Sequence, residues 1–445
     1  MTQSTYRGGA ILFLAFSFLA AFFISFSLLI NDLETQSEIK GVPYDKQPGL
    51  NTWFEADTTH VHEAFTNTKA FWHKTNRHPL FPYVSLLPVK VMGLLGVPEE
   101  FAVCFTLAVG VGLFSCLFAL TLVLTLGHRP LCWFMQALFF ASSFFIFWAG
   151  ICERFPMGGA TIMATAAGAA YLSRKEKPSL PLAVFLNIVS LSVTISNWMF
   201  GVLLSLCFFP LRKAIRITGY TVVITAILWL GEGLFIEQLE SPTHFDSWNK
   251  EFIFTDYAGS VFQKTSALLG HTVVMPEIHP YNFAGFQNMD GKGLGVQHSS
   301  PGGTGPLGFS LAVGWALLLI TGALSWWRNT EKTPFDRFLS FSILGQLGIH
   351  FVYGTELFLY GPHVAPLLLL VTARGLGALE RPKLKLALLA LGLFVPLLAL
   401  HNLARYTQAR LLFLHHYEGK KEAVSPEATT KPHALSPEIP LRPSA

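Results

Sequence analysis

Long apolar runs alternate with short polar segments along most of the chain. A helix needs about 20 residues to cross the hydrocarbon core of a bilayer, and most of these runs approach or exceed that length. The pattern therefore predicts an all-α protein that crosses a membrane many times. The shortest pair of runs is interrupted at Ser196–Trp198. The runs lie at about 9–30, 101–126, 131–150, 156–173, 180–197, 199–210, 217–235, 307–327, 336–353, 357–373 and 384–401.

Five short loops between these runs are basic. Two runs separate each consecutive pair of loops, so all five can lie on one side of the membrane. Lys and Arg in short loops mark the cytoplasmic side. We therefore expect a multi-pass protein with these loops in the cytoplasm. The loops are 127–130, 173–177, 210–216, 326–332 and 374–385.

The parity of crossings decides the role of residues 78–96. If the N-terminus is cytoplasmic, run 9–30 carries the chain outside, and an odd number of crossings must precede the basic loop at 127–130. Run 101–126 supplies one crossing. Segment 78–96 contains three prolines, which interrupt helices, and is expected to lie along the outer surface.

These expectations define the domain organisation. We predict about 11 transmembrane helices within a membrane domain at 1–405. Two long outer loops, 31–100 and 236–306, are expected to carry helices at the membrane surface. A polar tail, 406–445, is expected to be disordered because its end is rich in Pro, Ser and charged residues.

Composition supports the membrane assignment. Hydrophobic residues make up 51% of the chain and charged residues only 13%, whereas soluble domains carry about 25% charged residues. The net charge of +4 is small, and no basic tract with interleaved aromatic residues indicates a nucleic-acid partner. The five cysteines form no C-x-x-C motif and are expected to be core residues.

The first outer loop holds the most prominent polar residues. Its segment 55–72 has the pattern of an amphipathic surface helix that starts near Asp57. Asp57 is expected at the boundary between lipid and water, and Asp before Thr58 and Thr59 is a good N-cap for this helix. Glu55 is a second carboxylate close to it. The apolar side chains of the helix are expected on lipid, namely Val61, Phe65 and Phe71 or Trp72.

Three short motifs carry a resemblance to a known family. The stretches "ADTTHVHEAF", "NRHPLFPYV" and "LLGVPEEFAV" resemble the first outer loop of the GT-C superfamily, membrane glycosyltransferases that use polyprenyl-phosphate sugars. The branch of protein mannosyltransferases and lipid A aminoarabinose transferases is the most similar. The resemblance implies a GT-C fold and an inverting transfer of a sugar on the outer face of a bacterial inner membrane.

The resemblance also implies roles for particular residues. Asp57 takes the position of the general base that deprotonates the acceptor hydroxyl, with Glu55 as the rival base, and capping of the surface helix is the alternative role of Asp57. His78 occupies the position of a substrate-binding motif. Glu153, with Arg154, stands where the family has a second polar site, and either orients the acceptor or helps to hold a divalent metal with Asp57. An ordinary ion pair at a helix boundary is the alternative.

The helix that returns from outside near residue 357 supplies the remaining candidates. Members of the family contact the donor phosphate there, and this chain offers Glu356, Tyr360 and His363. The implied partners are a polyprenyl-phosphate sugar, a lipid, glycan or protein acceptor, and membrane lipids. Basic Lys74 and Arg77 are interpreted as contacts to lipid heads.

Two other functions stay open. A transporter or flippase would carry ionisable residues in the middle of its helices, whereas here the ionisable residues gather toward the outer side. A catalytically inactive protein of the same fold, which binds lipid-linked glycans, is the other alternative.

Overall fold

The computed structural model describes residues 3–40, 53–70, 73–127, 129–237, 239–240, 253–254, 256–282 and 292–423. The first half of the described chain contains α1 (Gln3–Lys40), α2 (Thr58–Thr66), α3 (Phe81–Val84), α4 (Leu86–Leu94), α5 (Glu99–Leu126), α6 (Pro130–Ala141), α7 (Ser143–Trp148), α8 (Phe155–Leu172), α9 (Leu180–Val193), the 3-10 turn η3 (Ile195–Asn197), α10 (Trp198–Phe208) and α11 (Leu211–Glu232).

The second half contains η5 (Asp256–Ala258), α12 (Val261–Thr265), the π-helical turn η6 (Ser266–His271), α13 (Pro306–Arg328), α14 (Pro334–Val352), η7 (Leu357–Tyr360), α15 (Gly361–Gly377) and α16 (Arg381–Ala423). Strands β1 (His279–Asn282) and β2 (Lys292–Gly295) form a small antiparallel ribbon that pairs His279 with Gly295. The predicted all-α membrane architecture is confirmed in its coarse form.

Six helical segments among the described residues are long and apolar enough to cross a membrane. Four shorter apolar stretches accompany them, among them Leu180–Val193 and Ile195–Phe208 on either side of the predicted interruption. The protein is therefore an integral membrane protein. The six segments are Gly8–Asn31, Glu99–Leu126, Leu211–Glu232, Pro306–Arg328, Leu357–Gly377 and Arg381–Leu412.

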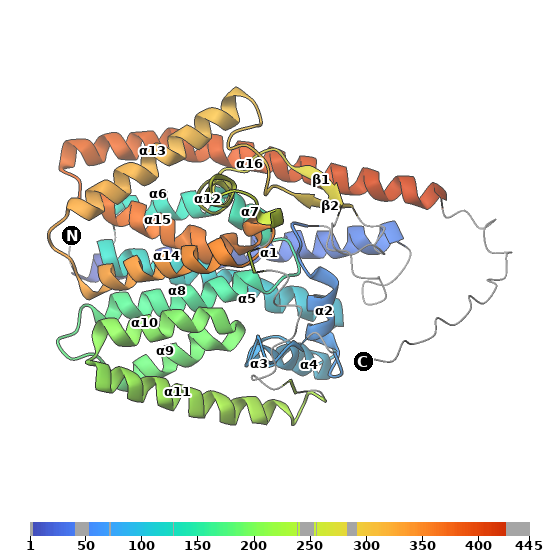
Figure 1. The fold of residues 1–445 in the computed structure, drawn as a ribbon, viewed down its shortest axis with the longest axis horizontal. Coiled ribbons are helices and arrows are strands. Elements are labelled where there is room, and N and C mark those ends of the chain that lie inside the picture. The colour runs from blue at the N-terminus through green and yellow to red at the C-terminus, as the bar shows by residue number, and fades with distance from the viewer. Residues whose placement is uncertain are drawn as a thin grey trace, which may run out of the picture.

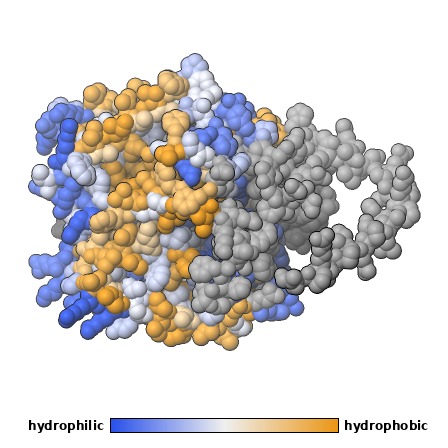
Figure 2. Space-filling model, in the orientation of Figure 1, coloured by the Kyte–Doolittle hydropathy of each residue, from blue (hydrophilic) through white to orange (hydrophobic). Residues whose placement is uncertain are grey.

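The bundle has two different ends (Figure 1). The start of α1 and the connections α8–α9, α10–α11, α13–α14 and α15–α16 lie at one end, while α2, α3, α4 and the ribbon lie at the other. Hydrophobic residues cover the length of the bundle between the ends, and hydrophilic residues gather at the end with the basic connections (Figure 2). This arrangement agrees with the sidedness expected from the basic loops.

The helix in the first long loop, 31–100, does not face lipid as predicted. Helix α2 covers Thr58–Thr66, but Val61 and Phe65 are fully buried in protein together with Phe81 and Val103. The expectation that they lie on lipid is wrong, because α4 and α5 pack over this side of α2. Phe71 and Trp72 lie outside the described residues.

Segment 78–96 forms no helix long enough to span a membrane. It folds into the short helices α3 and α4, which meet at Ser85. The hydroxyl of Ser85 donates to the carbonyl of Phe81 at 2.8 Å. Both helices lie at the end of the bundle that holds α2 (Figure 1), as the parity of crossings predicts.

Part of the second long loop enters the bundle, which the sequence did not predict. Run 131–150 is divided at Ser142 into α6 and α7. At this break the backbone N–H of Ser143 donates to the carbonyl of Val273 at 3.1 Å, and that of Phe144 donates to Thr272 at 3.0 Å. The loop thereby satisfies backbone donors that the break in the helix exposes.

Asn402 on α16 fastens this inserted segment. Its side-chain oxygen accepts from the backbone N–H of Met275 at 2.9 Å. Its amide nitrogen donates to the carbonyls of Ala141 at 2.7 Å and Val273 at 2.8 Å. One buried side chain therefore joins α6, the second outer loop and α16.

The C-terminal boundary is a correction to the predicted domains. Helix α16 continues to Ala423, and Tyr406 and Ala409 are buried. The tail expected from residue 406 therefore begins too early. The helix keeps a buried face beyond the apolar run that ends near residue 401, because Tyr406 packs against Trp53 and Phe147. Residues 424–445 lie outside the described residues.

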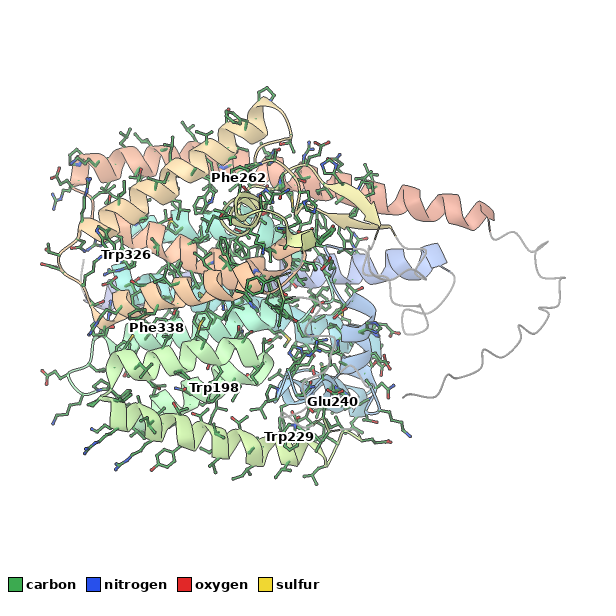
Figure 3. All side chains as sticks on the ribbon, viewed as in Figure 1. Trp198, Trp229, Glu240, Phe262, Trp326 and Phe338 are labelled. Carbon is green, nitrogen blue, oxygen red and sulfur yellow. The ribbon has the colours of Figure 1, made fainter. Side chains whose placement is uncertain are left out.

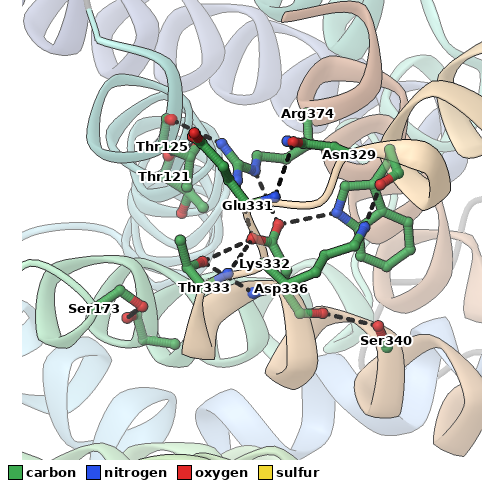
Figure 4. Close-up of polar contacts among 12 residues, drawn as sticks. Thr121, Thr125, Ser173, Asn329, Glu331, Lys332, Thr333, Asp336, Ser340 and Arg374 are labelled. Atoms are coloured by element: carbon green, nitrogen blue, oxygen red, sulfur yellow. Dashed lines mark hydrogen bonds and ion pairs between the residues drawn. The ribbon is translucent and has the colours of Figure 1, made fainter. Parts of the chain in front are cut away.

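An ion pair joins helices at the basic end (Figure 4). The guanidinium of Arg374 donates through Nε and Nη2 to the two carboxylate oxygens of Asp336, each at 3.0 Å. The same carboxylate accepts from Trp326 Nε1 at 2.9 Å and from the backbone N–H of Thr333 at 2.9 Å. Asp336 thus caps α14 while it holds α13 and α15.

We expect Asp336→Ala to destabilise the protein strongly. The substitution leaves Arg374 without its carboxylate, and removal of one partner of a buried pair costs about 3–5 kcal/mol. Thermal unfolding in detergent should show a large fall in midpoint. Lys383→Ala, which removes an exposed pair with Glu380, is the matched control and should change little. Equal effects of the two substitutions would contradict this interpretation.

Candidate functional site

Three separate segments meet at the end of the bundle that carries α2, α3 and α4 (Figure 1). They are the stretch before α2, the loop between α7 and α8, and the segment that enters α15. The first two are joined by Glu153, whose Oε2 accepts from the backbone N–H of Asp57 at 2.9 Å. Its Oε1 accepts from the backbone N–H of Arg154 at 2.7 Å. The structure therefore brings together Asp57, Glu153 and Arg154, as the sequence predicted.

Glu153 is a buried carboxyl with a perturbed acidity. Only 1% of the residue is exposed. Burial raises the pKa of Glu153 to about 7, because a charged carboxylate is poorly solvated there; the charge of Arg154 opposes the rise, and that of Asp57 adds to it. Glu153 is thus a group that can exchange a proton near neutral pH.

Asp57 occupies the N-cap position of α2, but its side chain makes no capping hydrogen bond. Capping is therefore not the role of its carboxylate in this structure. The side chain is half-buried. The backbone at Asp57 is instead fixed from both sides, since its carbonyl accepts from Val61 N–H at 2.8 Å.

Arg154 is a buried cation with spare donors. It is 5% exposed, and its Nε lies 3.7 Å from Oε1 of Glu153. The guanidinium carbon lies 5.3 Å from the centre of the Phe81 ring. Among the described residues, neither Nη1 nor Nη2 has a hydrogen-bond partner. Two buried donors in a fixed fork match the geometry of a carboxylate or a phosphate.

Lys74 is half-buried at the turn before α3, and the interpretation that it contacts lipid heads stays a prediction. Burial lowers the pKa of Lys74 to about 8, the charge of Asp57 opposes this shift, and the charge of Arg154 adds to it. Its backbone has a φ of 42°, so the chain turns sharply there. No apolar periodicity in the sequence signals such a turn.

His78 is anchored by the α9–α10 connection. Its Nδ1 lies 2.6 Å from the carbonyl oxygen of Val193, a contact in which Nδ1–H donates. Burial lowers the pKa of His78 well below its usual value, and the charge of Arg154 contributes. His78 is therefore a neutral imidazole beside the cations of the site, and Nε2 is its remaining acceptor.

Glu55 is held in an unusual backbone conformation. Phe54 and Glu55 have φ of 49° and 64°, which residues with side chains seldom adopt. The N–H of Phe54 donates to the carbonyl of Leu294 at 2.8 Å. The carboxylate of Glu55 accepts from the Thr355 hydroxyl and from the backbone of Glu356. The carboxylate of Glu55 is therefore engaged by hydrogen bonds, whereas that of Asp57 makes no capping bond.

Glu356 links the second outer loop to the site. One carboxylate oxygen accepts from the N–H of Val296 at 2.9 Å and of Gln297 at 3.1 Å. Gln297 in turn accepts from the N–H of Leu357 at 2.9 Å. The pKa of Glu356 is raised to about 8, first by burial and then by the charge of Glu55. Glu356 is thus structurally engaged and not free to bind substrate through that oxygen.

Tyr360 and His363 lie next to the start of α8. The ring of Tyr360 stacks on His350 with centres 3.9 Å apart, and the rings of Tyr360 and His363 each lie 5.4 Å from Phe155. His363 is 2% exposed, and its Nε2 has no hydrogen-bond partner among the described residues. Both rings therefore lie close to Phe155, the residue that follows Arg154.

A metal site is not evident from the protein ligands alone. The described residues contain no group of three or more His, Cys, Asp or Glu side chains placed to hold an ion. Asp57 and Glu153 are two carboxylate residues, and both oxygens of Glu153 already accept backbone hydrogen bonds, so a divalent metal would need water or substrate oxygens as well.

No family model, curated protein or solved structure matches the chain.

We expect the stability of the outer loops to fall as pH rises from about 4.5 to about 8. A carboxyl whose pKa is raised on folding binds its proton more tightly in the folded state, so it stabilises the fold at low pH and loses this contribution as pH rises through the folded value. The pKa of Glu356 is raised from 4.5 to about 8 and that of Glu55 to about 7.

Thermal unfolding across this pH range measures the effect. Glu356→Gln keeps the shape of the side chain without the ionisation, so its midpoint should depend less on pH than that of the wild type. Glu380→Gln, at an exposed carboxyl near the other end, should retain the wild-type dependence. An unchanged pH dependence in Glu356→Gln would show that this carboxyl does not titrate in the folded protein.

Proposed function

We propose that the chain is an inverting glycosyltransferase of the GT-C type, which moves a sugar from a polyprenyl-phosphate donor to an acceptor on the outer face of the membrane. One observation carries the proposal. The buried guanidinium of Arg154 has two unpartnered terminal nitrogens and lies beside Glu153 and Asp57. In the proposed reaction the carboxylate of Asp57 acts as the base, and the guanidinium of Arg154 binds the leaving phosphate beside it.

The proposed reaction balances as a single displacement. Asp57 accepts the proton of the acceptor hydroxyl, and the hydroxyl oxygen forms a bond to the anomeric carbon of the sugar. The bond from that carbon to the phosphate oxygen breaks, and polyprenyl phosphate leaves with the electron pair. Attack opposite the leaving group inverts the anomeric configuration. Asp57 afterwards releases its proton to water.

Charge at the leaving phosphate is the main demand on the site. The donor lipid keeps its chain in the outer leaflet and its phosphate at the boundary, since an unpaired phosphate in hydrocarbon is very costly. Donors fixed in advance stabilise the charge that develops in the transition state. Arg154 is the proposed phosphate ligand, with Lys74 as a second cation and His363 as a neutral neighbour.

The six long helices support an integral membrane protein, and we propose a more detailed topology for it. We propose 11 crossings, made by α1, α5, α6 with α7, α8, α9, α10, α11, α13, α14, α15 and α16, with the site facing outward. The short helices α9 and α10 are the weakest members. Their separation at Ile195–Asn197 lies at the end of the bundle where Ile195 N–H donates to the carbonyl of Arg77 at 2.9 Å.

We expect Asp57→Asn to lower sugar transfer by about 10²–10⁴-fold, the usual contribution of a positioned base. The side chain makes no capping bond, so thermal stability should be kept. Transfer is measured with purified protein, a polyprenyl-phosphate sugar and candidate acceptors. Glu63→Gln, on the same helix, is the matched control. Full activity in Asp57→Asn together with loss in Glu55→Gln would make Glu55 the base.

We expect Arg154→Ala to weaken binding of polyprenyl phosphate by about 10- to 100-fold, because hydrogen bonds to charged groups contribute roughly 1.5–3 kcal/mol. Binding of the uncharged polyprenol should not change. Arg174→Ala at the opposite end controls for a lost arginine. A transporter or an inactive binding protein would retain this phosphate dependence without transfer, whereas wild-type affinity in Arg154→Ala would remove the proposed phosphate site.

A further inference from the structure

A groove lies between α1 and α6 on the side of the bundle. Its volume is about 670 Å³, which is typical of a ligand site. Phe16 of α1 forms one wall, and the other wall follows α6 from Trp133 to Phe140. A helix rises about 10 Å over these positions. The groove is therefore long enough for part of a hydrocarbon chain and much shorter than a crossing helix.

The lining of the groove is apolar except at Gln136. That residue is 1% exposed, and its amide nitrogen donates to the hydroxyl of Ser115 at 2.8 Å, so it presents almost no surface to an occupant. Water gains few hydrogen bonds in such a place, whereas a hydrocarbon chain fits it. The lining residues are Phe16, Trp133, Phe134, Gln136, Ala137 and Phe140.

The open side of the groove belongs to the lipid-facing surface. Phe16 is 51% exposed and Trp133 is 40% exposed. On the same helix as Phe16, the side chains of Leu12 and Leu19 are also exposed, and this helix is one of the six long enough to cross a membrane. The groove is thus continuous with a surface that hydrocarbon covers, so its occupant is the chain of a lipid.

Two exposed cations flank the groove toward the basic end. Arg129 is the N-cap residue of α6 and lies one turn before Trp133. Helix α16 packs on α6, and a Cβ at Gly392 would lie 3.7 Å from Cε1 of Phe134. Lys385 precedes Gly392 by two turns, on the same face of α16. Arg129 and Lys385 are therefore placed at the level of lipid heads, next to the end of the groove.

Other basic side chains at this end are already engaged. Arg374 is paired with Asp336, and Lys383 is paired with Glu380. The ammonium of Lys332 lies 4.4 Å from the ring centre of Trp326, which Figure 3 shows at this end of the bundle.

Arg129 and Lys385 are exposed, and among the described residues neither belongs to an ion pair. These two cations are available to an anion from the membrane surface.

We propose that the groove between α1 and α6 binds a phospholipid with an anionic head from the leaflet at the basic end. One acyl chain lies in the groove, and the phosphate meets Arg129 and Lys385. Basic residues between membrane helices attract anionic lipid heads, whereas a zwitterionic head brings its own cation. The site lies at the opposite end from Asp57 and Arg154 and does not depend on the proposed glycosyl transfer.

Lipid retention by the purified full chain tests the proposal. The protein is placed in mixed micelles of phosphatidylglycerol and phosphatidylcholine with the same acyl chains, and bound lipids are measured by native mass spectrometry. We expect an about tenfold preference for phosphatidylglycerol, which two basic residues at the surface can supply. The double variant Arg129→Gln with Lys385→Gln should lose this preference. Ala137→Phe, which fills the groove, should lower retention of phosphatidylglycerol to that of phosphatidylcholine.

Matched controls separate this site from general attraction to a basic protein. Arg212→Gln with Lys213→Gln removes two exposed cations at the start of α11, which packs on α9 and α10, and should keep the preference. Ala390→Phe adds the same ring at an exposed position of α16 and should also keep it. If Ala137→Phe does not fold, the two double variants still test the site.

Several results would overturn the proposal. Equal loss of preference in the two double variants would mean that the lipid responds only to total charge. Unchanged retention in a folded Ala137→Phe would place the chain elsewhere. A dimer that Ala137→Phe dissociates, with lipid retention unchanged, would assign the groove to a second copy of the chain. Displacement of the lipid by soluble glycerophosphoglycerol would show that the head alone is bound.

Discussion

The carboxylate of Glu153 holds the outer end of this protein together. It accepts one backbone hydrogen bond from Asp57, 96 residues earlier in the chain, and another from its own neighbour Arg154. Burial of this carboxyl is tolerable only because both oxygens are engaged and a guanidinium lies beside it. The position of Asp57, the start of α2 and the packing of Arg154 over Phe81 all depend on this arrangement.

Most ionisable side chains near the site are buried, and this determines their properties. Desolvation is the largest influence on Glu55, Glu153 and Glu356, and it moves the pKa of each toward or above neutrality. The same influence lowers the pKa of Lys74 and His78. The pKa values of the three carboxyls and of Lys74 thereby approach one another, whereas His78 stays neutral because its pKa falls well below its usual value.

The sequence predicted the features that the bilayer imposes. Apolar runs and basic loops follow from the hydrocarbon and from the sidedness of charge, so the helices, the two ends and the non-spanning segment 78–96 could be foreseen. The sequence could not show whether the apolar face of α2 contacts protein or lipid. Phe65 is an apolar residue at the same helical position in either case. The charges that act on Lys74 could not be predicted for a related reason: they come from Asp57 and Arg154, which only the folded chain brings near.

The insertion of residues 272–275 into the break between α6 and α7 has a consequence for biosynthesis. The amides of Ser143 and Phe144 enter the membrane region long before their acceptors, Val273 and Thr272, have been translated. Asn402, which fastens the insertion, follows later still. The insertion is therefore fastened only after α16 has been made, so a truncated chain that contains every earlier helix would still lack the three hydrogen bonds of Asn402.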